Sequence, residues 1–77
     1  MIRELCIMAC VFCREHSFRD FVSDTTGEAC RNEAQAKAFI LIQCKITSRN
    51  ELDTNPEAAQ RFHDHIRVPY LAWREQQ

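Results

Sequence analysis

The scarcity of chain-turning residues constrains this sequence more than any other feature. Gly27 is the only glycine among 77 residues, and Pro56 and Pro69 are the only prolines. Tight β-turns depend on these residues because they need positive or pre-set φ angles, so an all-β sandwich or barrel is excluded. Glycine-rich phosphate-binding loops need several glycines and are excluded as well. We therefore expect an all-α chain.

Hydrophobic periodicity divides the chain into three predicted helices within a single small helical domain, residues 1–77. The helices cover roughly residues 2–16, 28–47 and 56–68, and an aromatic C-terminal turn follows at 69–75. Burying three apolar stripes favours a small three-helix bundle or a helical hairpin with an extra N-terminal helix. For residues 38–47 a strand is the competing interpretation, because its β-branched residues would share one face: Ile40, Ile42 and Ile46.

A serine or threonine followed three residues later by an acid marks two predicted helix starts. Ser17 with Asp20 predicts a short turn, and Thr25 with Glu28 predicts the start of the second long helix. Residues 39–42 of that helix are apolar in succession and cover more than half of its circumference. We therefore expect it to be the central helix, packed on several sides.

The third helix has its own start and stop signals. Asn55 can cap it while Pro56 takes the first helical position, where a missing N–H costs nothing. Capping by Thr54 together with Glu57 is the alternative. Pro69 removes a donor and clashes with the preceding turn, so we expect the helix to stop or kink just before it.

Five cysteines allow several interpretations: Cys6, Cys10, Cys13, Cys30 and Cys44. An odd number leaves one thiol over in any complete set of intrachain disulfides. A redox role for the CxxC needs a preceding strand, which this sequence does not offer. The first three positions follow i, i+4, i+7 spacing and so lie on one face of a helix. Because free cysteine behaves as a small hydrophobic residue, we expect these thiols to pack in the core.

Zinc is the alternative cofactor, although our main expectation is that no cofactor is bound. The CxxC formed by Cys10 and Cys13 offers two thiolates from one short turn, and His16, Cys30 or Cys44 could complete a tetrahedral site. The later cysteines stand singly, whereas structural zinc sites usually provide a second pair. The two histidines of the His-Asp-His segment 63–65 lie about 200° apart on a helix, so one metal ion would not reach both.

Charge and hydropathy restrict the partners and the location. The chain has 10 basic and 11 acidic residues in an even distribution, without the basic stripe typical of nucleic-acid binders. Its longest apolar stretch, residues 5–13, is far shorter than the ~20 residues of a membrane-spanning helix. The N-terminus lacks a basic region and a small-residue cleavage site. We therefore expect a cytoplasmic protein that binds neither nucleic acid nor a membrane.

An aromatic stripe near the C-terminus is the best candidate for binding a partner. It follows helical spacing through the third helix and consists of Phe62, Ile66, Tyr70 and Trp73. Tyrosine and tryptophan are enriched at interface hot spots. A chain near 60 residues buries only about 60% of its unfolded surface, so small domains often share a core with another copy or a partner. The stripe and residues 39–42 offer such a surface.

The second half of the chain contains Asn32-Glu33-Ala34-Gln35-Ala36-Lys37-Ala38-Phe39 and, further along, Asn55-Pro56-Glu57-Ala58-Ala59-Gln60-Arg61-Phe62. In general texture this part, roughly residues 30–77, resembles small uncharacterised bacterial prophage proteins. The resemblance implies a cytoplasmic accessory protein that binds a host or phage component, and it assigns no catalytic residue. A chain of this size rarely encloses a substrate pocket. We therefore predict a non-enzymatic interaction or regulatory protein that binds a protein partner or itself, with a small structural zinc module as the alternative.

Overall fold

A computed structural model describes residues 4–77, and every regular element in this range is helical. The expected all-α class is therefore confirmed. In chain order the elements are α1 (Glu4–Arg14), α2 (His16–Thr26), α3 (Glu33–Cys44), the single turn α4 (Glu51–Thr54), α5 (Pro56–Phe62), the π-helical segment η1 (His63–Arg67) and α6 (Val68–Glu75).

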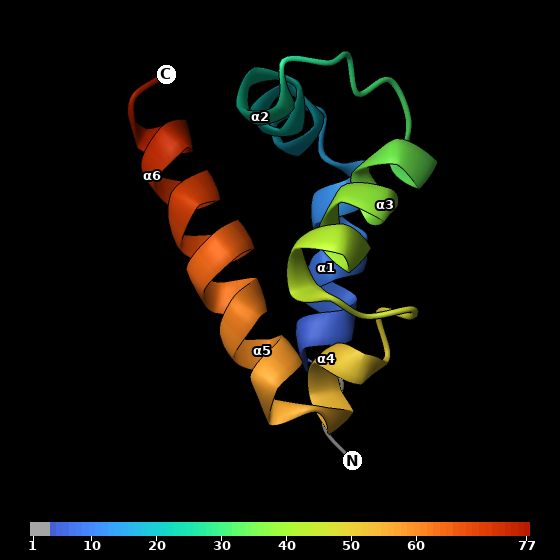
Figure 1. Cartoon of the computed structure of the whole chain (residues 1–77). Helices are drawn as coiled ribbons and strands as arrows, with labels where there is room; N and C mark the ends of the chain where they lie inside the picture. The colour runs from blue at the N-terminus through green and yellow to red at the C-terminus, as the bar shows by residue number, and fades with distance from the viewer. Residues whose placement is uncertain (1–3) are drawn as a thin grey trace.

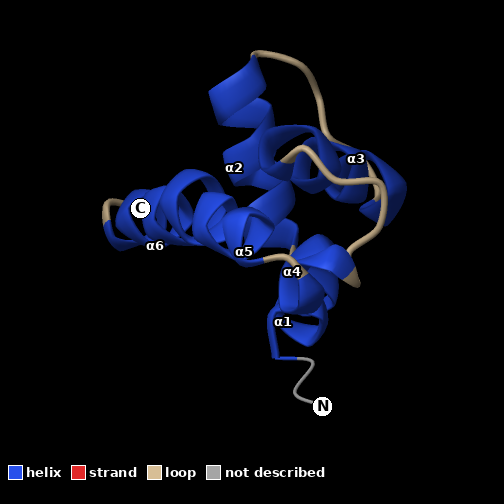
Figure 2. Ribbon diagram, turned by 60° about the horizontal axis from the view of Figure 1, so that its bottom comes forward, coloured by secondary structure: helices blue, strands red, loops and turns tan. Residues whose placement is uncertain are grey.

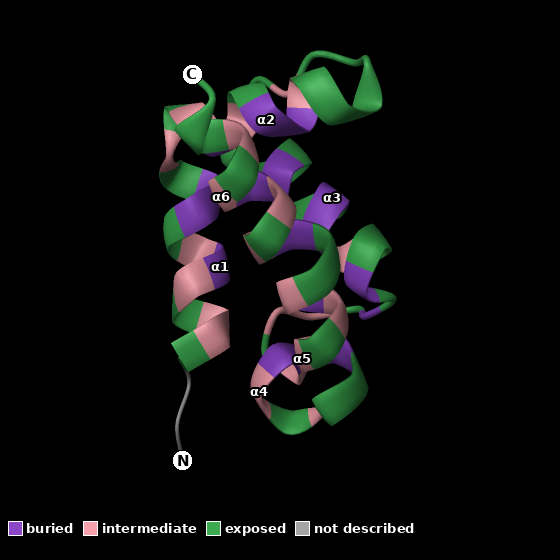
Figure 3. Ribbon diagram, turned by 90° about the vertical axis from the view of Figure 1, so that its left-hand side faces the viewer, coloured by how far each residue is buried: buried purple, intermediate pink, exposed green. Residues whose placement is uncertain are grey.

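The helices enclose one aromatic-rich core. α5, η1 and α6 form a continuous rod along one side of the molecule, α1 and α3 pack against each other beside it, and α2 lies at the end reached by α6 (Figure 1). The connections 27–32 and 45–50 both lie on the side of α3 (Figure 2). Buried faces of the helices turn toward one another (Figure 3). The core rings are Phe12, Phe18, Phe21, Phe39, Phe62 and Tyr70.

The helix expected over residues 2–16 corresponds to α1, and a second helix, α2, follows where only a short turn was expected; residues 2 and 3 lie outside the described part. Glu15 is extended, with φ −77° and ψ 129°, and separates α1 from α2. The turn brings Phe12 of α1 against Phe18 of α2, with ring centroids 5.4 Å apart. The predicted start at Ser17 is wrong, because Glu15 occupies the N-cap position and α2 is a full helix of 11 residues. The extended backbone at Glu15 thus lets the two phenylalanine rings pack against each other.

The second long helix begins later than the prediction of residue 28. Gly27, at φ 78°, ends α2, so Thr25 still belongs to that helix and caps nothing. Asn32 caps α3 instead, and its side chain accepts a hydrogen bond from the Gln35 amide. The glutamine side-chain oxygen in turn accepts from the backbone N–H of Arg31 at 2.5 Å. This Asn–Gln arrangement takes the place of the expected Thr25–Glu28 pair.

The second long helix also ends earlier than the predicted residue 47, at Cys44. The next residue, Lys45, has a left-handed backbone with φ 58°, and the Ile46 amide donates to the Leu41 carbonyl at 3.0 Å. These are the bonds of a Schellman motif, which usually places glycine where the lysine stands. The strand alternative for 38–47 is wrong, since α3 runs through 38–44.

The third helix starts as predicted and continues past its expected end. The Asn55 side chain accepts from the amides of Glu57 and Ala58, with Pro56 in the first turn. At the far end, Pro69 does not stop the helix, which reaches Glu75. The predicted turn 69–75 is therefore helix α6.

The π-helical segment explains why proline is tolerated there. Proline in a regular α-helix lacks one N–H and meets the carbonyl four residues earlier. In η1 the Val68 amide donates to the His63 carbonyl, five residues back, so the turn before Pro69 is widened. Such widened turns are known sites of helix distortion. The rod thus remains continuous and brings its last two turns to α2.

Candidate functional site

Most of the aromatic stripe expected to bind a partner lies in the core. Phe62, Ile66 and Tyr70 have no exposed surface, because α1, α2 and α3 cover the inner side of the rod. A partner cannot contact them unless the helices open. Trp73 remains partly exposed, and its indole N–H donates to an Asp24 carboxylate oxygen at 2.9 Å. The stripe therefore closes the domain itself, which is a correction to the partner-binding role expected of it.

Polar contacts attach α6 to the junction of α1 and α2. The Tyr70 hydroxyl donates to Glu15 Oε2 at 3.0 Å and lies 2.6 Å from Ser17 Oγ. Arg74 lies over the tyrosine ring and 3.5 Å from the same carboxylate. Burial raises the pKa of Tyr70, and the nearby Glu15 carboxylate adds to this effect. The tyrosine therefore holds α6 against the junction of α1 and α2 as a neutral donor.

The expected zinc ligands are not gathered into one site. The part of the chain that the structure describes has no group of three or more His, Cys, Asp or Glu side chains arranged to hold a metal ion. Cys13 and Cys44 have no exposed surface, whereas Cys10 and Cys30 are half-buried. His16 is exposed and pairs with Asp20 at 3.1 Å. Of the three thiols expected to pack in the core, Cys13 is buried, whereas Cys6 and Cys10 are only half-buried.

Three of the thiols are held in the protonated form beside arginines. Burial raises the pKa of Cys13, Cys30 and Cys44, in the last case to about 11. The positive charges of Arg49, Arg19 and Arg61, respectively, oppose this effect without cancelling it. Zinc binds the thiolate form, and a neighbouring guanidinium repels the cation. These three thiols are therefore neutral at pH 7.

The His-Asp-His segment lies in the π-helical turn. His63 is half-buried, with Nδ1 3.4 Å from an Arg67 nitrogen, whereas Asp64 and His65 are exposed. A groove of about 540 Å³ beside the π-helical turn is lined by Glu4, Leu5, Met8, Leu52, Asp53, His63 and Arg67.

That groove contains a structural carboxylate. Both Asp53 oxygens accept hydrogen bonds from the start of α1, at 3.0 Å from the Leu5 amide and 3.0 Å from the Cys6 amide. The carboxylate therefore satisfies two of the otherwise unpaired N–H groups of a helix N-terminus. Its neighbours carry both signs of charge, so the groove selects no ligand chemistry.

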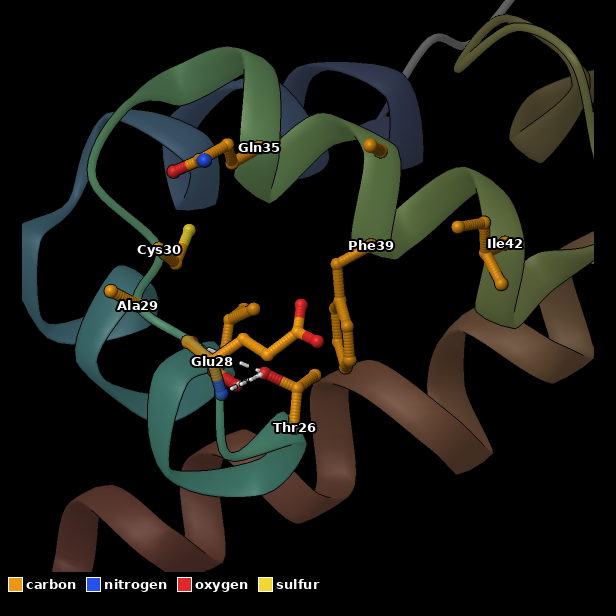
Figure 4. Close-up of a pocket in the computed structure, with 9 residues that line it drawn as sticks. Thr26, Glu28, Ala29, Cys30, Gln35, Phe39 and Ile42 are labelled. Carbon is orange, nitrogen blue, oxygen red and sulfur yellow. Dashed lines mark hydrogen bonds between the residues drawn. The ribbon is translucent and has the colours of Figure 1, made fainter.

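A second, largely apolar pocket lies between α2 and α3, and we call it the α2–α3 pocket. It has a volume of about 250 Å³ and is lined by Val22, Thr26, Glu28, Ala29, Cys30, Gln35, Ala38, Phe39 and Ile42. The Phe39 ring points from α3 toward Thr26, and Ile42 lies at one end (Figure 4). With 72% of its surface exposed, Ile42 is the most exposed large hydrophobic residue of the described chain.

Side-chain hydrogen bonds shape one wall of the α2–α3 pocket. Thr26 Oγ1 donates to the Val22 carbonyl at 2.8 Å and accepts from the Glu28 amide at 3.2 Å. Ser23 Oγ accepts from the Cys30 amide at 2.7 Å. These bonds hold residues 28–30 against the end of α2, so the pocket is a preformed feature of the fold.

Sequence reasoning expected this helix at the centre, packed on several sides, and α3 does contact α1, α2, α5 and η1. One strip of its surface stays open, because Ala38 and Ile42 face outward. The four successive apolar residues 39–42 are more than one helix face can bury. This pattern in the sequence could have predicted that one of them stays exposed. The pocket residues on α2 and in the connection, Val22, Ala29 and Cys30, had no such signal because only tertiary packing brings them beside α3.

Neither the hydropathy of the helices nor similarity to known proteins assigns a role to the site. None of the helices within residues 4–77 combines the length and the apolar character needed to cross a membrane. Comparison of the chain with protein-family models, with curated proteins and with solved structures found no match.

Proposed function

We propose that this chain is a small, non-enzymatic helical interaction protein that binds a protein partner through the α2–α3 pocket. The observation that carries the proposal is the exposure of Ile42 next to a preformed apolar hollow. An exposed Ile alone is ordinary, but an apolar pocket with an exposed rim is a typical interaction site. We place this activity in the cytoplasm, where thiols such as those of Cys10 and Cys30 stay reduced.

The size of the α2–α3 pocket supports a protein partner over a small substrate. Small-molecule sites usually enclose about 300–1,000 Å³. The pocket is smaller, at about 250 Å³, and suits one anchoring side chain of a larger partner. Buried apolar anchors of this kind contribute most of the affinity at protein interfaces.

Site-specific photo-crosslinking in producing cells tests the proposal. A photoreactive amino acid replaces Ile42 in one variant and, as the control, Val68 in another; Val68 is 61% exposed on α6. We expect an adduct with one defined protein, identified by mass spectrometry, from position 42 alone. The same adduct should disappear when Ala38→Arg fills the pocket rim. Equal adducts from both positions, or none from position 42, would contradict the proposal.

A further inference from the structure

The outward face of α1 is a narrow strip that is exposed along the whole helix. Four residues of α1 are exposed, and they follow one another at intervals of three, four and three: Glu4, Ile7, Val11 and Arg14. We call them the α1 strip. This spacing places their side chains on one side of the helix, as in the seam of a coiled coil. Ile7 and Val11 expose 61% and 45% of their surface, so the middle of the strip is apolar.

The two ends of the α1 strip carry opposite charges that cannot pair with each other. Glu4 and Arg14 lie ten residues apart, which corresponds to about 15 Å along an α-helix. The ion pairs within residues 4–77 join other side chains. Only a second molecule with a base and an acid at the matching distance can therefore pair with both ends at once.

Charged groups near the two ends leave this difference in place. Asp53 adds negative charge at the start of α1, where its oxygens accept from two amides, and Arg19 adds positive charge at the end, where it donates to a carbonyl at 3.3 Å. Two groups of the opposite sign lie nearby, and both are engaged elsewhere. Arg67 borders the groove at the acidic end and contacts His63. Glu15, next to the basic end, is held by the contacts of α6.

We propose that a second copy of this chain packs antiparallel on the α1 strip. In such a pair, with a twofold axis at the level of Ala9, each residue faces the one equally far beyond the axis. Glu4 and Arg14 each lie five residues from Ala9, and Ile7 and Val11 each lie two. The acid of one copy therefore faces the base of the other, and the two apolar residues face each other. The twofold axis repeats each contact, so the strip is complementary to itself.

The α1 strip is smaller than a stable interface, so we expect a weak dimer that forms as the protein concentration rises. Stable interfaces bury about 1,200–2,000 Å² in total, and smaller ones belong to transient complexes. The lining of the α2–α3 pocket comes from α2, α3 and the connection between them. The dimer therefore leaves that pocket open, and this inference does not depend on the proposed function.

Sedimentation velocity of the full chain under reducing conditions tests the dimer and its register. Glu4→Arg and Arg14→Glu each place like charges opposite one another at both symmetric contacts. Each should weaken dimerisation about tenfold, since an exposed pair contributes modestly. Mixing the two variants should restore association as a heterodimer, because every facing pair is again of opposite sign. The double variant that exchanges both charges should also dimerise, and high salt should reduce these differences.

The double variant also separates an interface effect from a folding effect. Both substitutions oppose the helix dipole, so the double variant has the least stable α1 and yet should regain the dimer. Ile7→Ala should weaken dimerisation, whereas Val68→Ala should not, although both side chains are 61% exposed. A chain that stays monomeric at millimolar concentration would overturn the inference. Single charge variants that still dimerise, no recovery on mixing, or a dimer lost on Ile42→Glu instead of Ile7→Ala would overturn it too.

Discussion

Two isoleucines on α3 provide a matched pair for testing its orientation. Ile40 has no exposed surface, whereas 72% of Ile42 is exposed, two residues further along. Truncating a fully buried Ile to Ala costs about 2–5 kcal/mol, the sum of lost transfer free energy and the cavity left behind. A chain of this length has a total stability of roughly 4–12 kcal/mol. Ile40→Ala should therefore remove a large share of it.

Ile42→Ala should change the free energy of unfolding by less than about 0.5 kcal/mol, as at other exposed positions. The better helix propensity of alanine offsets part of the lost contact. Urea denaturation followed by circular dichroism measures both variants. If Ile40→Ala fails to fold, Ile40→Val should still cost about 0.5–1.5 kcal/mol. Equal losses at the two positions would refute the orientation of α3, because a strand is the arrangement that places both side chains on one face.

Three further substitutions test contacts between elements and helix ends. Tyr70→Phe should lower the free energy of unfolding by about 1–2 kcal/mol, because it removes the shared partner of Ser17 and Glu15; an unchanged denaturation midpoint would show that these bonds do not attach α6. Lys45→Gly should raise the melting temperature, because a left-handed backbone costs an L-residue about 1–2 kcal/mol. The greater conformational entropy of glycine in the unfolded chain offsets only about 0.4–1 kcal/mol of this gain. A lower melting temperature would contradict the assigned φ of 58°. Burial raises the pKa of Cys44 to about 11 from 9.0, so the folded state holds this proton more tightly. The contribution of this proton to the free energy of unfolding is complete below pH 9 and is lost as the pH rises toward 11. Urea denaturation across this interval should show a smaller decrease in the free energy of unfolding for Cys44→Ala than for the original sequence.

Local signals predicted some helix starts well and others poorly. Asn55 followed by Pro56 was read correctly, because a cap and a proline at the first position act within a single turn. Thr25 and Glu28 matched a capping box by spacing alone, yet Gly27 adopts positive φ between them and ends a helix there. The pattern that caps α3, an Asn with a Gln three residues later, was present in the sequence and belongs to the same type of signal.

Long-range packing decides whether the helix continues past Pro69 and whether the aromatic stripe is buried. A proline normally ends a helix, but here the buried Phe62, Ile66 and Tyr70 hold the rod in place while a π-helical turn absorbs the missing N–H. The same burial moves these three side chains from the expected interface into the core. No sequence pattern distinguishes an apolar stripe that faces a partner from one that faces the rest of its own chain.

The sequence by itself determined the helical class, because one glycine and two prolines leave too few turns for sheets and the apolar periodicity is helical. It also showed that there are more apolar residues than one buried face on each of three helices can hold. The tertiary structure alone decided which of them remain outside. Helix periodicity defines a face, but the direction in which that face points depends on helices distant in the chain, and these cover Tyr70 while leaving Ile42 exposed beside the α2–α3 pocket.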